Sequence, residues 1–127
     1  MPGALILIVD DNEKNTKLAR DVLRFAGFRT LEAGNGTDAI ALAIKHLPNL
    51  ILMDVRLPDM DGSDATRELK ADARTVRIPV VALTSLALHE HHEWLLDAGF
   101  DGYLEKPISV REFPDQVRRY CTSASED

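Results

Sequence analysis

The chain has 127 residues, 45% of them hydrophobic and 28% charged, which suits one globular domain with a single core. Its formal net charge of -6 leaves no basic field for nucleic acid, so we expect no direct DNA binding. The lone Cys121 fits a reducing compartment, and the apolar run 4–9 is too short to span a membrane. We therefore expect a cytoplasmic domain over 1–121, without membrane insertion, and a polar, disordered tail at 122–127.

Five short runs along the chain predict strands. Three of them, at 4–9, 50–54 and 78–83, are apolar at almost every position, which is typical of strands buried on both faces. The runs at 29–33 and 101–105 mix polar and apolar residues, as edge strands do. A helical pattern follows each run, and this alternation predicts right-handed crossovers and a parallel sheet.

The helices between the strands show start and stop signals. Gly27 is a natural stop for the first helix, and Thr37 can cap the second, whose Leu47 is expected to face inward. A third helix is expected at about 63–71 and a fourth before the next strand. Pro114 lies inside the last helix and predicts that this helix is kinked or starts late.

Apolar content also suggests the order of the strands. The first, third and fourth strands are apolar throughout and should be central, whereas the second and fifth should be edges. The order 2-1-3-4-5 satisfies this arrangement. We therefore predict an α/β fold, a flavodoxin-like (βα)5 doubly wound five-stranded parallel sheet.

Polar residues follow the predicted strands at the point where each strand ends. They are Asp10, Asp11, Asp54, Thr84 and Lys106. Because parallel strands all end at one edge, and the first and third strands are neighbours, the three carboxylates are expected to meet there. Clustered carboxylates repel one another, and a hard divalent cation relieves that repulsion. Magnesium takes one or two carboxylates and keeps positions open for water and phosphate, so we predict Mg²⁺.

This set of residues indicates phosphoryl chemistry. A carboxylate beside magnesium can attack phosphorus and form an aspartyl-phosphate, and Asp54 is the candidate nucleophile. Lys106 would supply an ammonium and Thr84 a hydroxyl to neutralise the phosphoryl oxygens. Each residue alone has an ordinary interpretation as a helix cap, a turn residue or a surface lysine. Together they would need several independent coincidences at the strand ends, so a functional site is favoured.

The same residues resemble the receiver domain of bacterial two-component response regulators, over essentially the whole chain. The run Val9-Asp10-Asp11-Asn12-Glu13 is most similar to stand-alone receivers of the DivK type. The resemblance implies that Asp54 is the phosphoacceptor and that Mg²⁺ is bound by Asp11 directly and by Asp10 through a water. It further implies that the main-chain carbonyl of Arg56 binds the metal, and that Thr84 and Tyr103 are the switch residues.

The resemblance also implies the partners. A sensor histidine kinase or a histidine phosphotransfer protein would donate the phosphoryl group, and the phosphorylated form would signal through protein–protein contact. The protein would catalyse only its own phosphoryl transfer and autodephosphorylation. We expect the downstream target to bind the face of the fourth helix, the fifth strand and the fifth helix, with Trp94 as a partly exposed contact residue.

Three positions depart from the family pattern, and one of them is Pro114 inside the last helix. Arg56 is bulky and cationic and could contact the phosphoryl group, and Leu86 offers no polar group to guide an attacking water. One alternative function is a magnesium-dependent phosphohydrolase, but such enzymes usually carry a second Asp where this chain has Arg56. Another is a phosphorylation-independent adaptor with the same fold, and the intact set of site residues argues against it.

Overall fold

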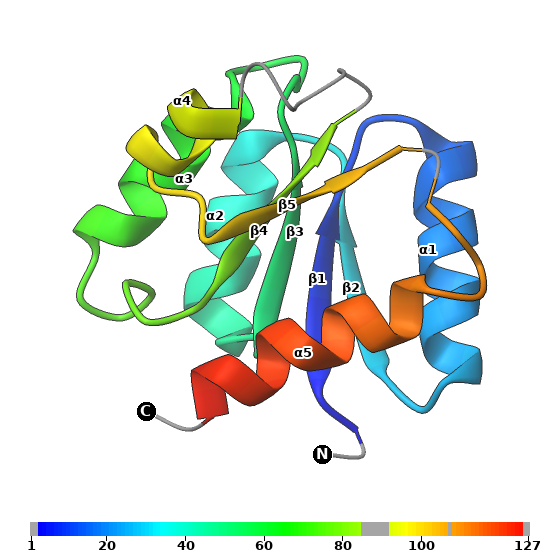
Figure 1. Ribbon diagram of the computed structural model, residues 1–127. Helices are drawn as coiled ribbons and strands as arrows, with labels where there is room; N and C mark the ends of the chain where they lie inside the picture. Colours follow the sequence, from blue (N-terminus) through cyan, green and yellow to red (C-terminus); the bar gives the residue numbers. More distant parts are fainter. Residues whose placement is uncertain (1–2, 85–91, 107, 126–127) are drawn as a thin grey trace.

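One parallel sheet with the strand order β2-β1-β3-β4-β5 forms the centre of the molecule (Figure 1). The computed structural model describes residues 3–84, 92–106 and 108–125. The strands are β1 (Leu5–Val9), β2 (Arg29–Ala33), β3 (Leu50–Asp54), β4 (Val80–Thr84) and β5 (Gly102–Glu105). Every neighbouring pair runs parallel, which confirms the predicted doubly wound sheet and its order.

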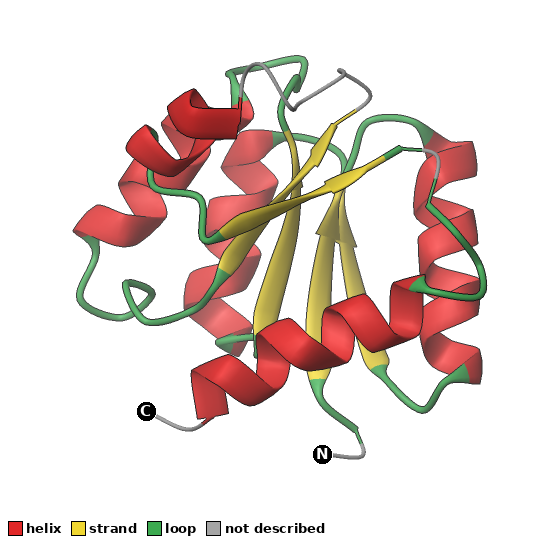
Figure 2. Ribbon diagram, in the orientation of Figure 1, coloured by secondary structure: helices red, strands yellow, loops and turns green. Residues whose placement is uncertain are grey.

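Helices cover both faces of the sheet (Figure 2). They are α1 (Glu13–Phe25), α2 (Gly36–His46), α3 (Gly62–Ala71), α4 (His92–Asp97) and α5 (Phe113–Ser125). Residues of α2, α3 and α4 share one core cluster with the sheet, and residues of α1 and α5 share the other. The result is a three-layer α/β domain with a hydrophobic core on each side of the strands.

Burial along the strands follows their composition. Every residue of β3 and β4 is buried, whereas β2 and β5 each have a single buried residue. Runs of apolar residues with no alternation are buried on both faces, because helices cover both sides of a parallel sheet. The strand runs therefore predicted the central and edge positions correctly.

The helix α2 differs from prediction at both of its ends. Its N-cap is Asn35, whose side chain accepts a hydrogen bond from Asp38 N, so the helix starts before Thr37. Leu47 ends the helix in a left-handed conformation with φ 49° and is 55% exposed. Because a residue in this conformation leaves the helical path, Leu47 does not continue the buried stripe.

The last helix confirms a late start. It begins at Phe113, so Pro114 lies in the first turn, where the missing N–H of proline has no intrahelical acceptor to lose. The helix continues to Ser125 and so includes part of the range 122–127, where we expected a polar tail. The predictions for Leu86 and for the side chain of Trp94 lie outside the described residues and side chains.

Candidate functional site

Four charged side chains meet at the carboxyl edge of the sheet. Asp10 and Asp11 follow β1, Asp54 is the last residue of β3, and Lys106 follows β5. Carboxylate oxygens of the three aspartates lie within 4.8 Å of one another. Lys106 Nζ lies 2.9 Å from Asp10 Oδ2 and 3.1 Å from Asp54 Oδ2. The structure therefore brings together the acidic cluster and the lysine that the sequence placed at the strand ends.

Asp10 has one carboxylate oxygen without a hydrogen bond. Its Oδ1 accepts a hydrogen bond from Asn12 N–H at 2.9 Å. Its Oδ2 is fully buried and accepts no hydrogen bond from the described part of the chain. Lys106 Nζ lies 2.9 Å from Oδ2 and forms an ion pair with it. This oxygen therefore depends on the Lys106 ammonium, which Asp10 shares with Asp54.

Asp54 is buried and has partners on both oxygens. Oδ1 accepts a hydrogen bond from Arg56 N–H at 3.1 Å, and Oδ2 accepts one from Lys106 Nζ. Burial is the largest effect and raises the pKa of Asp54, although the Arg56 amide and the Lys106 charge both oppose the shift. The ionised form of Asp54 is therefore held at the sheet edge at an energetic cost.

Lys106 is stabilised in its charged form. Burial is the largest single effect on its ammonium and lowers the pKa, but the contacts with Asp10 and Asp54 together outweigh burial and raise the pKa. The ammonium is therefore a fixed positive charge beside Asp54. Such a charge can neutralise oxygen atoms of an anionic group that reacts at this position.

The residues present fit a divalent cation. Three carboxylates and one ammonium leave a formal charge of -2 at the cluster. Carboxylate oxygens are the ligands that hard cations prefer, and one ammonium does not balance the charge of three carboxylates. The cluster could therefore hold a metal ion such as Mg²⁺.

The loop after Asp54 is closed tightly at its base. Gly62 N–H donates to Val55 O at 2.7 Å, and Arg56 and Asp61 form an isolated antiparallel bridge. A Cβ atom at Gly62 would collide with the main-chain oxygen of Asp54, so a residue without a side chain is required there. The loop therefore returns to the end of β3 directly beside the candidate nucleophile.

Thr84 and Tyr103 lie on the neighbouring strands β4 and β5. Thr84 is buried at the end of β4, and its carbonyl accepts the N–H of Lys106 at 2.8 Å. Tyr103 lies opposite Ala82 in the strand register and is half-buried against the core cluster of α2, α3 and α4. Thr84 is thus part of the carboxyl edge, whereas Tyr103 sits farther back along the sheet.

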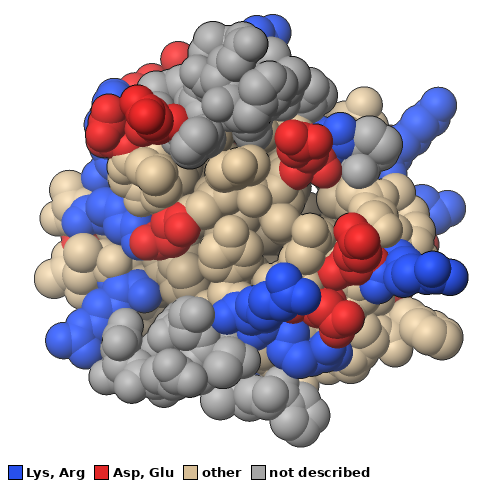
Figure 3. Space-filling view, in the orientation of Figure 1, with Lys and Arg blue, Asp and Glu red and all other residues tan. Residues whose placement is uncertain are grey.

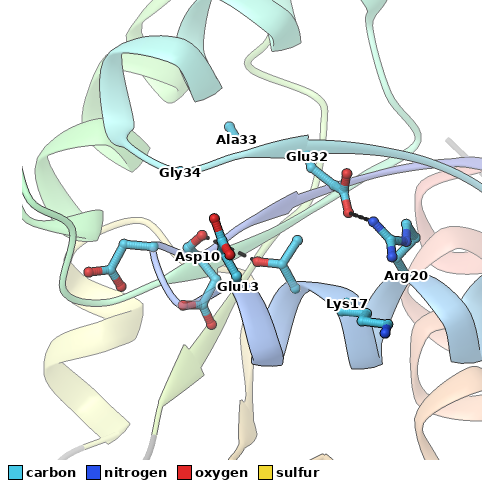
Figure 4. A pocket seen from close by; sticks show the side chains of 9 residues that line it. Asp10, Glu13, Lys17, Arg20, Glu32, Ala33 and Gly34 are labelled. Atoms are coloured by element: carbon cyan, nitrogen blue, oxygen red, sulfur yellow. Dashed lines mark hydrogen bonds and ion pairs between the residues drawn. The ribbon is translucent and has the colours of Figure 1, made fainter.

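An open cleft of about 480 Å³ adjoins the acidic cluster along α1 (Figure 4). Asp10 and Glu13 lie toward one end, and Arg20 and Glu32 point toward each other at the other end, 2.9 Å apart. The cleft contains Asp10 and Asp11 in its lining but neither Asp54 nor Lys106. It therefore gives access to the acidic cluster from the α1 side.

Sequence reasoning missed two polar residues near the site. Asn12 is the N-cap of α1 and accepts hydrogen bonds from Lys14 N and Asn15 N. Asn is a preferred N-cap residue, so its position before the helix was a usable signal. Asp59 binds the start of α2, and its position in a loop rich in turn residues gave no such indication.

None of the helices in the described parts of the chain has the length and the apolar stretch that a membrane crossing needs.

Comparison with known proteins places the chain among receivers. Residues 6–118 match the family described as the response regulator receiver domain. The polar-differentiation response regulator DivK of Brucella anthropi is 40% identical over 119 residues, which covers 94% of this chain and 97% of the relative.

Two solved structures have the same fold. The receiver domain of the sensor histidine kinase PA1611 from Pseudomonas aeruginosa PAO1 matches with a TM-score of 0.86 and 38% identity, over 94% of this chain and 98% of that one. That crystal structure has a magnesium ion coordinated in its active site cleft. A CheY-like response regulator receiver domain protein from Methanospirillum hungatei JF-1 matches with a TM-score of 0.87 and 25% identity, over 98% of both chains.

Proposed function

The chain belongs to the response regulator receiver domain family, and on that premise we propose that Asp54 is its phosphoacceptor. Phosphorylation of an aspartate and the use of Mg²⁺ are general in this family. The observation that carries the proposal is the position of Asp54, which lies 3.1 Å from Lys106 and within the acidic cluster. The donor would be the phosphohistidine of a sensor kinase or of a phosphotransfer protein.

In the proposed reaction an Asp54 carboxylate oxygen attacks the phosphorus of the donor. A phosphorus–oxygen bond forms, the phosphorus–nitrogen bond breaks, and the imidazole leaves with the electron pair. Lys106 neutralises a phosphoryl oxygen, and the Arg56 N–H holds the other Asp54 oxygen in place. Mg²⁺, held by Asp11, Asp54 and the Arg56 carbonyl, with Asp10 acting through a water, would supply further positive charge to the phosphoryl group.

Thr84 and Tyr103 are proposed to convert phosphorylation into a change of surface. The Thr84 hydroxyl, at the end of β4, would bind the phosphoryl group and thereby shift the segment that follows this strand. Thr84→Ala should therefore still accept phosphate, because the metal and Lys106 remain, but should lose most of the conformational response. Amide chemical shifts with and without phosphodonor measure that response, and a variant that switches like the native protein would place the coupling elsewhere.

The proposed output surface is the face of α4, β5 and α5. In Figure 3 acidic side chains lie over α4 and mostly basic ones over α5, and the surface between them is largely uncharged with a few acidic side chains. A surface that carries few charges at its centre and more at its rim suits a protein partner. We propose that phosphorylated protein binds its downstream target there, in the cytoplasm, and that autodephosphorylation ends the signal.

Mass spectrometry of the intact protein tests the proposed function. After incubation with Mg²⁺ and a small phosphodonor, the native protein should gain the mass of one phosphoryl group, and a chelator should prevent the gain. Continuous turnover of the donor without a stable gain would instead indicate a phosphohydrolase. A protein that neither gains mass nor consumes the donor would act as an adaptor, and both of these outcomes would contradict the proposal.

A further inference from the structure

The loop between β3 and α3 is held at its tip by the carboxylate of Asp59. Oδ1 accepts a hydrogen bond from Gly36 N–H at 2.8 Å, and Oδ2 accepts bonds from Thr37 N–H at 3.0 Å and Thr37 Oγ1–H at 2.7 Å. These donors form the first turn of α2, where free N–H groups and the helix dipole favour an anion. The Thr37 hydroxyl, followed by the two amides, lowers the pKa of Asp59 to about 2.

Close packing accompanies the hydrogen bonds between Asp59 and the first turn of α2. Met60 lies against Gly36, where a Cβ atom would be 2.5 Å from Met60 Cγ, so any larger residue would displace the Met60 side chain. At the base of the same loop, the bridge between Arg56 and Asp61 fixes the chain beside Asp54. The loop is therefore attached at its base to the end of β3 and at its tip to α2.

The helix end that Asp59 binds is itself part of the surroundings of the acidic cluster. Ala33 and Gly34, just before α2, line the cleft together with Asp10 and Asp11. Asp10 N–H donates to Ala33 O at 3.1 Å, which joins this segment to the end of β1. Asp59 thus connects two segments that border the cluster on different sides, residues 33–37 and residues 55–61.

We propose that Asp59 is a positioning residue for the metal and phosphoryl site. It holds the loop after Asp54 against α2, so that the Asp54 carboxylate and the main chain of Arg56 are in place before the ion binds. Magnesium demands near-ideal octahedral geometry, and a loop that had to be ordered on binding would weaken its affinity. This role rests on the proposed function, because it concerns the same site, but Asp59 itself touches neither the metal nor the donor.

The test compares Asp59→Ala with Asp38→Asn. Asp38 lies in the same first turn of α2, but its carboxylate accepts a hydrogen bond from Asn35 Nδ2 rather than from the loop side of the helix. Asp59→Ala should weaken Mg²⁺ binding, measured by titration calorimetry, by roughly tenfold, the low end for residues that orient metal ligands. Asp38→Asn should bind Mg²⁺ like the native protein. At saturating Mg²⁺ the phosphorylation rate of Asp59→Ala should return to near the native rate, because the reacting groups are unchanged.

Two further variants secure the result if Asp59→Ala does not fold. Asp59→Asn keeps the shape but loses the charge, and Thr37→Val removes one of the three donors, so both should weaken Mg²⁺ binding less than Asp59→Ala. The positioning role would be overturned if all folded Asp59 and Thr37 variants bound Mg²⁺ with native affinity. It would also be overturned if Asp38→Asn lost as much Mg²⁺ affinity as Asp59→Ala. Asp59 would then be an ordinary helix cap. If the native protein binds Mg²⁺ but is not phosphorylated, the proposed function fails, while the difference in Mg²⁺ affinity still decides the role of Asp59.

Discussion

Two lysine–aspartate clusters lie at opposite edges of the sheet and differ in how completely their polar atoms are paired. At the amino edge, Lys70 Nζ donates to Asp101 Oδ2 at 2.8 Å and to the carbonyls of Ile78 and Val76 at 2.9 and 3.3 Å. Asp101 Oδ2 also accepts Val80 N–H at 2.8 Å. Lys70 therefore uses all three of its donors within the protein, which joins the end of α3 to the starts of β4 and β5.

At the carboxyl edge, one ammonium serves several carboxylates. Lys106 contacts both Asp10 and Asp54, Asp11 lies beside them, and Asp10 Oδ2 has no hydrogen bond in the described structure. Complete pairing is what a structural cluster needs, whereas unpaired oxygens and excess like charge persist where a ligand completes the site. Both clusters carry charged residues, so charge alone does not distinguish them. The functional edge of this sheet is distinguished by carboxylates that outnumber their positively charged partners.

Replacing an aspartate by asparagine in each cluster should show most clearly which cluster takes part in phosphorylation and which is only structural. Asp54→Asn should abolish phosphorylation by a small phosphodonor and Mg²⁺, because the amide oxygen is no nucleophile for phosphorus. Asp101→Asn should be phosphorylated at the native rate, since its partners lie at the opposite edge. Intact mass spectra measure both. A phosphorylated Asp54→Asn protein, or an inert Asp101→Asn protein that is folded, would break the comparison.

The three carboxylates of the functional cluster should not contribute equally to metal binding. Asp11 is the expected direct ligand and Asp10 the one that acts through water, so Asp11→Ala should weaken Mg²⁺ binding by roughly 100-fold and Asp10→Ala by roughly tenfold. Titration calorimetry gives both values, with Asp101→Asn as a control of native affinity. Equal losses in the two variants would remove the distinction between the two ligands.

Much of this site could be predicted from the sequence because its parts follow strands. Apolar runs located β1, β3 and β4, and the rule that parallel strands end at one edge then brought Asp10, Asp54 and Lys106 together. The tie made by Asp59 could not be predicted in this way. Asp59 joins a loop to a helix start 23 residues away along the chain. The segment between Pro58 and Gly62 has the composition of an ordinary turn, so its aspartate gives no sign of this contact.

The ends of the helices were still harder to predict from the sequence. Asn35 and Thr37 both suit an N-cap, and local preference alone does not choose between them. In the structure Asn35 caps the helix through Asp38 N, and Asp59 binds the N–H groups of Gly36 and Thr37 from outside the helix. Leu47 likewise carries an apolar side chain that pattern alone assigns to the core, while its left-handed backbone ends the helix and exposes it. Tertiary contacts and backbone conformation decide these positions.

Stability should respond with opposite signs in the two clusters. In metal-free buffer, Asp54→Asn relieves repulsion among the three carboxylates and should raise the free energy of unfolding by roughly 0.5–1 kcal/mol. Asp101→Asn breaks the pair with Lys70 and should lower it by about 1 kcal/mol. Urea unfolding followed by circular dichroism checks both values. Destabilisation of similar size in both variants would show that the carboxyl edge is an ordinary structural cluster.

Asp59 should behave as a satisfied carboxylate, with a small effect that depends on pH. Its pKa is about 2 in the folded protein, below the ordinary 3.8, so its stabilising contribution is present at neutral pH. That contribution is lost as the pH falls from about 4 through about 2, because protonation then costs more in the folded state than in the unfolded chain. Asp59→Asn should unfold at a lower urea concentration than the native protein at pH 7, and the difference should narrow at pH 3. A difference that stays constant between pH 7 and pH 3 would show that the charge of Asp59 contributes nothing.

The position of the phosphoryl group on the native chain is the most direct test of the account. The protein is treated with phosphodonor and Mg²⁺, the acyl phosphate is reduced with borohydride to mark its residue, and the digest is sequenced by mass spectrometry. We predict that the mark lies on Asp54 and on no other residue. A mark on Asp10, Asp11 or any residue outside the cluster, with Asp54 unmodified, would contradict the central claim.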